Sequence, residues 1–75
     1  MSRHVNLNRA ALIEIRERSG LSKTELAQRA GVDRTLVHRL ENGERRATPT
    51  VMRKLADALA CPLMAIMGPE EEEAA

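Results

Sequence analysis

The sequence contains no phenylalanine, tyrosine or tryptophan among its 75 residues. Without an aromatic ring, the chain cannot stack an unpaired base on a side chain, which argues against single-stranded DNA or RNA as the ligand. Any core must be built from Leu, Ile, Val, Met and Ala. Because a chain this short is near the lower size limit for a self-sufficient core, association with a second subunit is one way for it to gain stability.

Residues that signal secretion, metal binding or catalysis are also scarce. The single cysteine, Cys61, cannot form an internal disulfide, and no apolar stretch resembles a signal peptide or a membrane span, so we expect a cytoplasmic protein. His4, His38 and Cys61 do not have the spacing of zinc ligands. The sequence has no arrangement of a nucleophile with a neighbouring general base. It also has no glycine-rich phosphate loop and no pair of catalytic carboxylates. We therefore expect no metal, no cofactor and no enzymatic activity.

Charge is unevenly distributed along the chain. The formal net charge is only +1, but four of the eleven acidic residues form the run Glu70 to Glu73. Outside that run, twelve Lys and Arg face seven acidic residues, which leaves a balance of +5. A basic body with a short acidic segment is compatible with phosphate binding, although it does not identify the partner.

Capping signals divide the first part of the chain into three short helices. Asn6 or Asn8 can cap a first helix that ends at Ser19-Gly20. Ser22 and Glu25 have the spacing of a capping box, which predicts a second helix over residues 23–30. Gly31 closes that helix, and Asp33 can cap a third over residues 34 to about 41.

Two further helices are predicted after this point. Thr48 is a suitable N-cap and Pro49 suits the first helical position, where its missing N–H costs nothing. Apolar residues then recur with helical spacing at Met52, Leu55, Ala56 and Leu59. After Cys61-Pro62, residues 63–67 are expected to form a short fifth helix.

Two short helices joined around Gly31 are the outline of a helix-turn-helix. The small Ala27 and Ala30 allow close approach to Val37 and Leu40 across a tight turn. The predicted fold is therefore all-α, a compact bundle of about five short helices that contains a helix-turn-helix. We expect a flexible basic arm over residues 1–7, the domain over 8–68 and a disordered acidic tail over 69–75.

The third helix has two different faces. Val37 and Leu40 turn inward, and the opposite face carries only hydrogen-bonding side chains, those of Arg34, Thr35, His38 and Arg39. Such a helix fits the major groove, where arginine can bond guanine O6 and N7. A charged, solvated helix face is the alternative. Leu36 either joins the core or meets a thymine methyl group.

Residues 21–43, LSKTELAQRAGVDRTLVHRLENG, resemble the phage repressor and Cro family of helix-turn-helix domains, the XRE type. The resemblance extends over roughly residues 8–67 and includes RKLADAL at 53–59. Its most specific motifs are Glu25-Leu26-Ala27, Gly31-Val32, Glu41-x-Gly43 and Lys54-Leu55-Ala56. It implies the lambda-repressor-like fold and binding to double-stranded DNA in a bacterial or phage setting, with the protein associated with the nucleoid.

The resemblance also assigns roles to individual residues. The base-reading positions are Asp33, Arg34, Thr35, His38 and Arg39. The phosphate-binding positions are Lys23, Asn42, Arg45 and Arg46. Arg16 and Glu41 are expected to form a buried ion pair. Relatives commonly dimerise through the region of the fifth helix, whose apolar residues Leu63, Met64, Ile66 and Met67 are the expected dimer interface.

The function predicted from the sequence is that of a transcriptional regulator, most simply a repressor that binds a palindromic operator as a homodimer. The alternative is an antitoxin-like or adaptor protein that binds DNA and also holds a protein partner through its last helix and acidic tail. Glu70 to Glu73 are either a solvated end or a competitor of DNA phosphates for the basic body.

Overall fold

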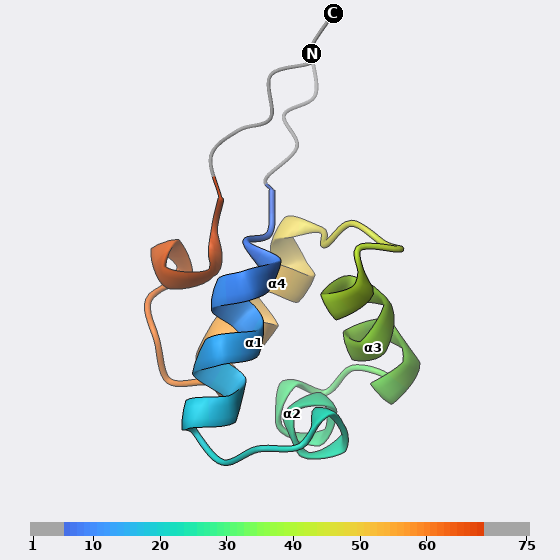
Figure 1. Ribbon diagram of the computed structural model, residues 1–75, viewed down its shortest axis with the longest axis vertical. Helices are drawn as coiled ribbons and strands as arrows, with labels where there is room; N and C mark the ends of the chain where they lie inside the picture. The colour runs from blue at the N-terminus through green and yellow to red at the C-terminus, as the bar shows by residue number, and fades with distance from the viewer. Residues whose placement is uncertain (1–5, 69–75) are drawn as a thin grey trace, which may run out of the picture.

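The computed structural model describes residues 6–68, in which helical segments follow one another through short connections (Figure 1). The segments are α1 (Arg9–Arg18), α2 (Lys23–Ala30), α3 (Arg34–Asn42), α4 (Pro49–Ala58) and the 3-10 helix η1 (Leu63–Ile66). This all-helical architecture is the predicted fold class, with a 3-10 turn in place of the fifth α-helix.

Side-chain caps explain where most of these helices begin. Asn8 is the N-cap of α1 and accepts a hydrogen bond from the Ala11 N–H at 3.1 Å. Ser22 and Glu25 form the predicted capping box of α2. Thr48 caps α4, which has Pro49 in its first turn as predicted. α3 differs from the prediction, because Asp33 occupies the N-cap position without a side-chain hydrogen bond to the helix.

Two glycines end the helices of the helix-turn-helix. Gly31 closes α2 with φ 71° and Gly43 closes α3 with φ 79°, both in the left-handed region that favours glycine. At each cap the backbone N–H donates to carbonyl groups of the last helical turn. The chain can therefore reverse within a few residues and place α3 across α2.

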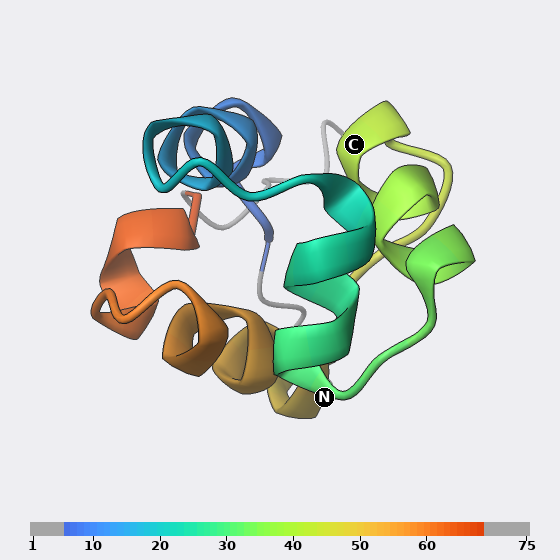
Figure 2. The same cartoon turned by 90° about the horizontal axis from the view of Figure 1, so that it is seen from below.

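The core lies where the helices meet, and α2 is at its centre. Figure 2 shows α2 between α3 and α4, while α1 and η1 complete the other side of the bundle. The largest fully buried side chains are Leu12, Leu26, Val37, Leu40, Met52, Leu55 and Ile66. They come from every helical segment, so burial of their aliphatic side chains holds the bundle together without an aromatic residue.

Two sequence expectations need correction here. Ile66 was expected at a dimer interface, but its side chain is 0% exposed and belongs to the core, because the 3-10 turn directs it onto the bundle. The expected flexible arm does not include Asn6 and Leu7. Leu7 pairs with Met67 in an antiparallel bridge, and the Gly68 N–H donates to the Asn6 carbonyl at 2.8 Å.

The remaining segments of that division, residues 1–5 and 69–75, lie outside the described residues. The acidic run Glu70 to Glu73 falls in the second of them. Among the helices of residues 6–68, none has both the length and the apolar character needed to cross a membrane.

Candidate nucleic-acid interface

α3 separates a buried face from a polar face. Val37 and Leu40 are fully buried against the other helices. Leu36 is half-buried and packs against the core, which favours the first of its two sequence interpretations. The exposed residues of α3 are Arg34, Thr35, His38, Arg39 and Asn42. Their guanidinium, hydroxyl, imidazole and amide groups are those that hydrogen-bond to base edges and phosphates.

A shallow hollow of about 420 Å³ lies between the start of α2 and the polar face of α3. It is lined by Lys23 and Thr24 of α2 and by Arg34, Thr35 and His38 of α3. The structure thus brings together three of the expected base-reading residues and one expected phosphate-binding residue. Asp33 is exposed at the N-cap of α3, adjacent to Arg34 in the chain.

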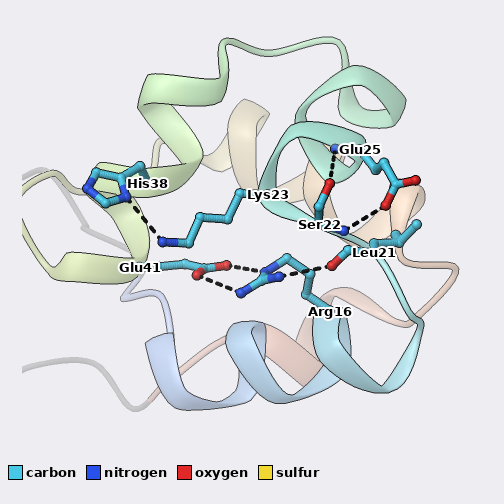
Figure 3. Close-up of polar contacts among 7 residues, drawn as sticks. All are labelled: Arg16, Leu21, Ser22, Lys23, Glu25, His38 and Glu41. Atoms are coloured by element: carbon cyan, nitrogen blue, oxygen red, sulfur yellow. Dashed lines mark hydrogen bonds and ion pairs between the residues drawn. The ribbon is translucent and has the colours of Figure 1, made fainter.

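His38 links two of the expected phosphate-binding residues, Lys23 and Asn42. The Lys23 Nζ lies 3.1 Å from His38 Nδ1 (Figure 3). The Asn42 amide nitrogen lies 3.1 Å from His38 Nε2. An ammonium can only donate, so Nδ1 accepts and a neutral ring carries its proton on Nε2. The Asn42 side chain can accept a hydrogen bond from that proton through its amide oxygen. The three side chains connect the start of α2 to the end of α3.

A buried ion pair holds α3 against α1 (Figure 3). Arg16 Nε donates to Glu41 Oε2 at 2.7 Å, and Arg16 Nη2 donates to Glu41 Oε1 at 3.1 Å. The remaining Nη1 donates to the Leu21 carbonyl at 2.9 Å. The two side chains are only 10% and 3% exposed. One guanidinium therefore connects α1, the loop before α2 and the end of α3.

The start of α2 is fixed by its own capping box. The Glu25 N–H donates to Ser22 Oγ at 3.0 Å, and the Ser22 N–H donates to Glu25 Oε1 at 2.8 Å. The hydrogen bond from the Ser22 backbone N–H to the carboxylate, with a smaller contribution from the Ser22 side chain, lowers the pKa of the Glu25 carboxyl from its ordinary value of 4.5. Lys23 follows the cap directly, so the cap also sets the direction from which Lys23 reaches the interface.

A second, larger hollow of about 850 Å³ lies between the start of α1 and the loop after α3. It is lined by the expected phosphate-binding residues Arg45 and Arg46, and also by Arg9 of α1. We call it the arginine hollow. Arg9 was missed by the sequence interpretation, because it lies at the first position of a helix far from the motif and no local pattern marks it.

Outside these two hollows, the described residues include few groups that could bind a ligand or catalyse a reaction. Cys61 is half-buried, and this burial raises the pKa of its thiol. No group of three potential ligands for a metal ion occurs in residues 6–68. Met64 on η1 is 79% exposed, whereas Leu63 and Met67 are half-buried against the core.

The chain is similar to known proteins that contain a helix-turn-helix. Residues 12–66 match the family model described as helix-turn-helix, HTH_3. The chain belongs to the helix-turn-helix family. Members of this family bind double-stranded DNA as transcription regulators, and this helix-turn-helix protein is of that type. None of the curated proteins compared with the chain matches it significantly.

Two solved structures are similar to this helix-turn-helix protein. One is the restriction-modification controller protein C.AhdI from Aeromonas hydrophila, with a TM-score of 0.74 and 35% identity, over 76% of this chain and 86% of that chain. The other is an HTH_3 family transcriptional regulator from Vibrio cholerae, with a TM-score of 0.74 and 29% identity over 77% of this chain. This chain spans 33% of the Vibrio cholerae regulator.

Proposed function

We propose that the protein is a repressor that binds a palindromic operator as a homodimer, with α3 in the major groove of each half-site. The observation that carries this proposal is the two-faced α3. Its apolar residues are buried in the core, and its exposed face carries Arg34, Thr35, His38 and Arg39. A helix presented in this way by a rigid bundle has the shape and the donors that the major groove requires.

In this proposal, base reading and phosphate binding are divided between two sets of residues. Arg34, Thr35 and Arg39 read bases, with Asp33 and His38 beside them. Arg34 is best suited to a guanine, because a guanidinium can donate to O6 and N7 together. Lys23, Asn42, Arg45 and Arg46 bind the backbone, which is the same at every base pair. Lys23 keeps two N–H groups for a phosphate while the third remains on His38.

Dimerisation in this proposal uses the apolar surface at η1. Met64 is the large apolar side chain that residues 6–68 leave exposed, and half-buried Leu63 and Met67 lie beside it in the chain. Burial of this surface against a second copy would remove it from water. Two subunits related by a two-fold axis then face half-sites about 34 Å apart, or a multiple of that distance.

The test compares Arg34→Ala with Arg46→Ala, both at exposed positions. The operator is first identified by selection from a random DNA pool, where a palindromic consensus is expected. Arg34→Ala should weaken operator binding by about 1–3 kcal/mol and relax the preference at one position of each half-site. Arg46→Ala should weaken binding to operator and scrambled DNA alike, and should reduce the salt slope by about one unit.

The opposite pattern would reject the assignment of α3 as the recognition helix. That pattern is an equal loss on both DNAs for Arg34→Ala and an altered sequence preference for Arg46→Ala. A selected consensus without two-fold symmetry would reject the palindromic operator, and equal affinity for one half-site and for the full site would reject the dimer.

A further inference from the structure

The arginine hollow has a surplus of positive charge. Arg9, Arg45 and Arg46 line it, and among residues 6–68 none of the three forms an ion pair. Glu41 also lines the hollow, but both of its carboxylate oxygens accept hydrogen bonds from Arg16. Three guanidinium groups around one concave surface, without an ion-pair partner among those residues, favour an anionic occupant.

The Arg9 guanidinium lies against the end of α3. A Cβ atom built on Gly43 would lie 2.6 Å from Arg9 Nη1 and 2.9 Å from Arg9 Cζ. The absence of a side chain at Gly43 therefore leaves the space that the Arg9 guanidinium occupies. Arg9 therefore lies beside the loop that carries Arg45 and Arg46.

The described part of the chain ends at the rim of this hollow. Gly68 lines the hollow, and its N–H donates to the Asn6 carbonyl at 2.8 Å, which fixes where the following residues start. Pro69 and the run Glu70 to Glu73 come next. At about 3.5 Å per extended residue, these glutamates can reach points up to roughly 7–18 Å from Gly68. A sphere of the hollow's volume is about 12 Å across, so the whole hollow is within reach.

We propose that the arginine hollow binds the acidic run Glu70 to Glu73 of the same chain, and that this contact competes with DNA phosphates for Arg45 and Arg46. The proposal rests on the proposed function for its effect on DNA binding, but not for the contact itself. The competing segment is tethered at the rim, so it is present at every binding event, and its carboxylates resemble the phosphates in charge. Arg9 is the residue that belongs to the contact and not to the proposed DNA interface.

The expected size of the effect follows from tethering. A segment held at an effective concentration of about 1 mM and bound with a Kd of about 0.25 mM weakens a competing ligand about fivefold. Because the contact is between exposed charges, salt should screen it strongly. The weakening of DNA binding by the acidic run should therefore be largest at low ionic strength. It should be equal for operator and scrambled DNA.

The experiment uses the full chain and a tail-neutral variant, which carries Glu70→Gln, Glu71→Gln, Glu72→Gln and Glu73→Gln. Their affinities for operator and scrambled duplexes are measured by fluorescence anisotropy at two salt concentrations. At about 50 mM salt the tail-neutral variant should bind both duplexes about fivefold more tightly, and at about 200 mM the gain should fall below about twofold.

Arg9→Gln separates a contact in the hollow from a general effect of negative charge. When Arg9→Gln is added both to the full chain and to the tail-neutral variant, the gain in DNA affinity from neutralising the acidic run should shrink from about fivefold to about twofold. Arg53→Gln is the matched control, because Arg53 is exposed on α4 and does not line the hollow. It should leave the fivefold gain unchanged. An equal reduction by both substitutions would show long-range repulsion and would overturn the proposal.

A second measurement does not depend on DNA binding at all. In NMR spectra of the free protein, neutralising the acidic run should shift the Gly43 amide and the Arg9 Nε–H more than the resonances of α4. Absence of those shifts would overturn the contact, whatever the DNA data show. If the shifts occur but neither chain binds the selected DNA, the proposed function fails and the contact stands.

Discussion

The most informative single perturbation is removal of the negative charge at Glu41. Glu41→Gln keeps the size of the side chain and one acceptor oxygen, but it leaves the Arg16 guanidinium without a counter-charge. Arg16 is tied to Glu41 by two hydrogen bonds and to the Leu21 carbonyl by a third, and the Glu41 side chain is only 3% exposed. Solvent can therefore compensate little of the lost charge.

The expected cost is about 3 kcal/mol of unfolding free energy, at the lower end of the roughly 3–5 kcal/mol for breaking a buried pair. The lower end applies because Arg16 keeps its bond to Leu21 and one bond to the new amide. A domain of this length has roughly 4–11 kcal/mol of stability in total, so the loss is a large share of it. An exposed pair would lose less than about 1 kcal/mol.

The assay is urea unfolding followed by circular dichroism, with the variant compared with its parent at low temperature. Arg16→Met, Glu41→Leu and their combination complete a double-mutant cycle. Because the combination leaves no unpaired buried charge, it should cost clearly less than the sum of the single changes. Arg18→Met is the control, since the Arg18 and Glu14 side chains of its ion pair are 78% and 61% exposed.

A stability of Glu41→Gln within about 0.5 kcal/mol of the parent would refute the burial argument. Additive costs in the double-mutant cycle would refute the coupling between the two residues. Either result would mean that packing of Val37 and Leu40, and not the ion pair, holds α3 against the bundle.

Three other predictions follow from the described residues. Met64→Glu should abolish dimer formation in analytical ultracentrifugation while the circular dichroism spectrum stays helical, whereas Ile66→Glu should unfold the chain because its side chain is fully buried. Retention of the dimer by folded Met64→Glu would exclude η1 as the interface. Ser22→Ala should lower the unfolding free energy by about 1 kcal/mol through loss of the α2 cap, and an unchanged urea midpoint would show that the cap is not stabilising. The pKa of Glu25 is lower in the folded protein, so its stabilisation is complete above pH 4.5 and is lost as the pH falls through the lowered pKa. Glu25→Gln should therefore flatten the acid limb of the stability profile, and an unaltered limb would contradict this.

Local signals sufficed for the helices and for their order. The caps at Asn8, Ser22 and Thr48 and the glycines at 31 and 43 act within a few residues, so their effect can be read from the sequence. The same holds for the two faces of α3, because the helical repeat alone places Val37 and Leu40 opposite Thr35 and Arg39. The pairing of Arg16 with Glu41 came from a family motif, since 25 residues separate them.

The set of helices and the polar face of α3 can therefore be predicted from the sequence, because both depend on neighbours within one or two turns. The contacts across the bundle are known only from the folded structure. That structure buries Ile66 in the core, places Leu7 beside Met67, and brings Arg9 over Gly43 to join Arg45 and Arg46 around one hollow. Those contacts depend on how the helices pack against one another, and no spacing along the chain encodes them.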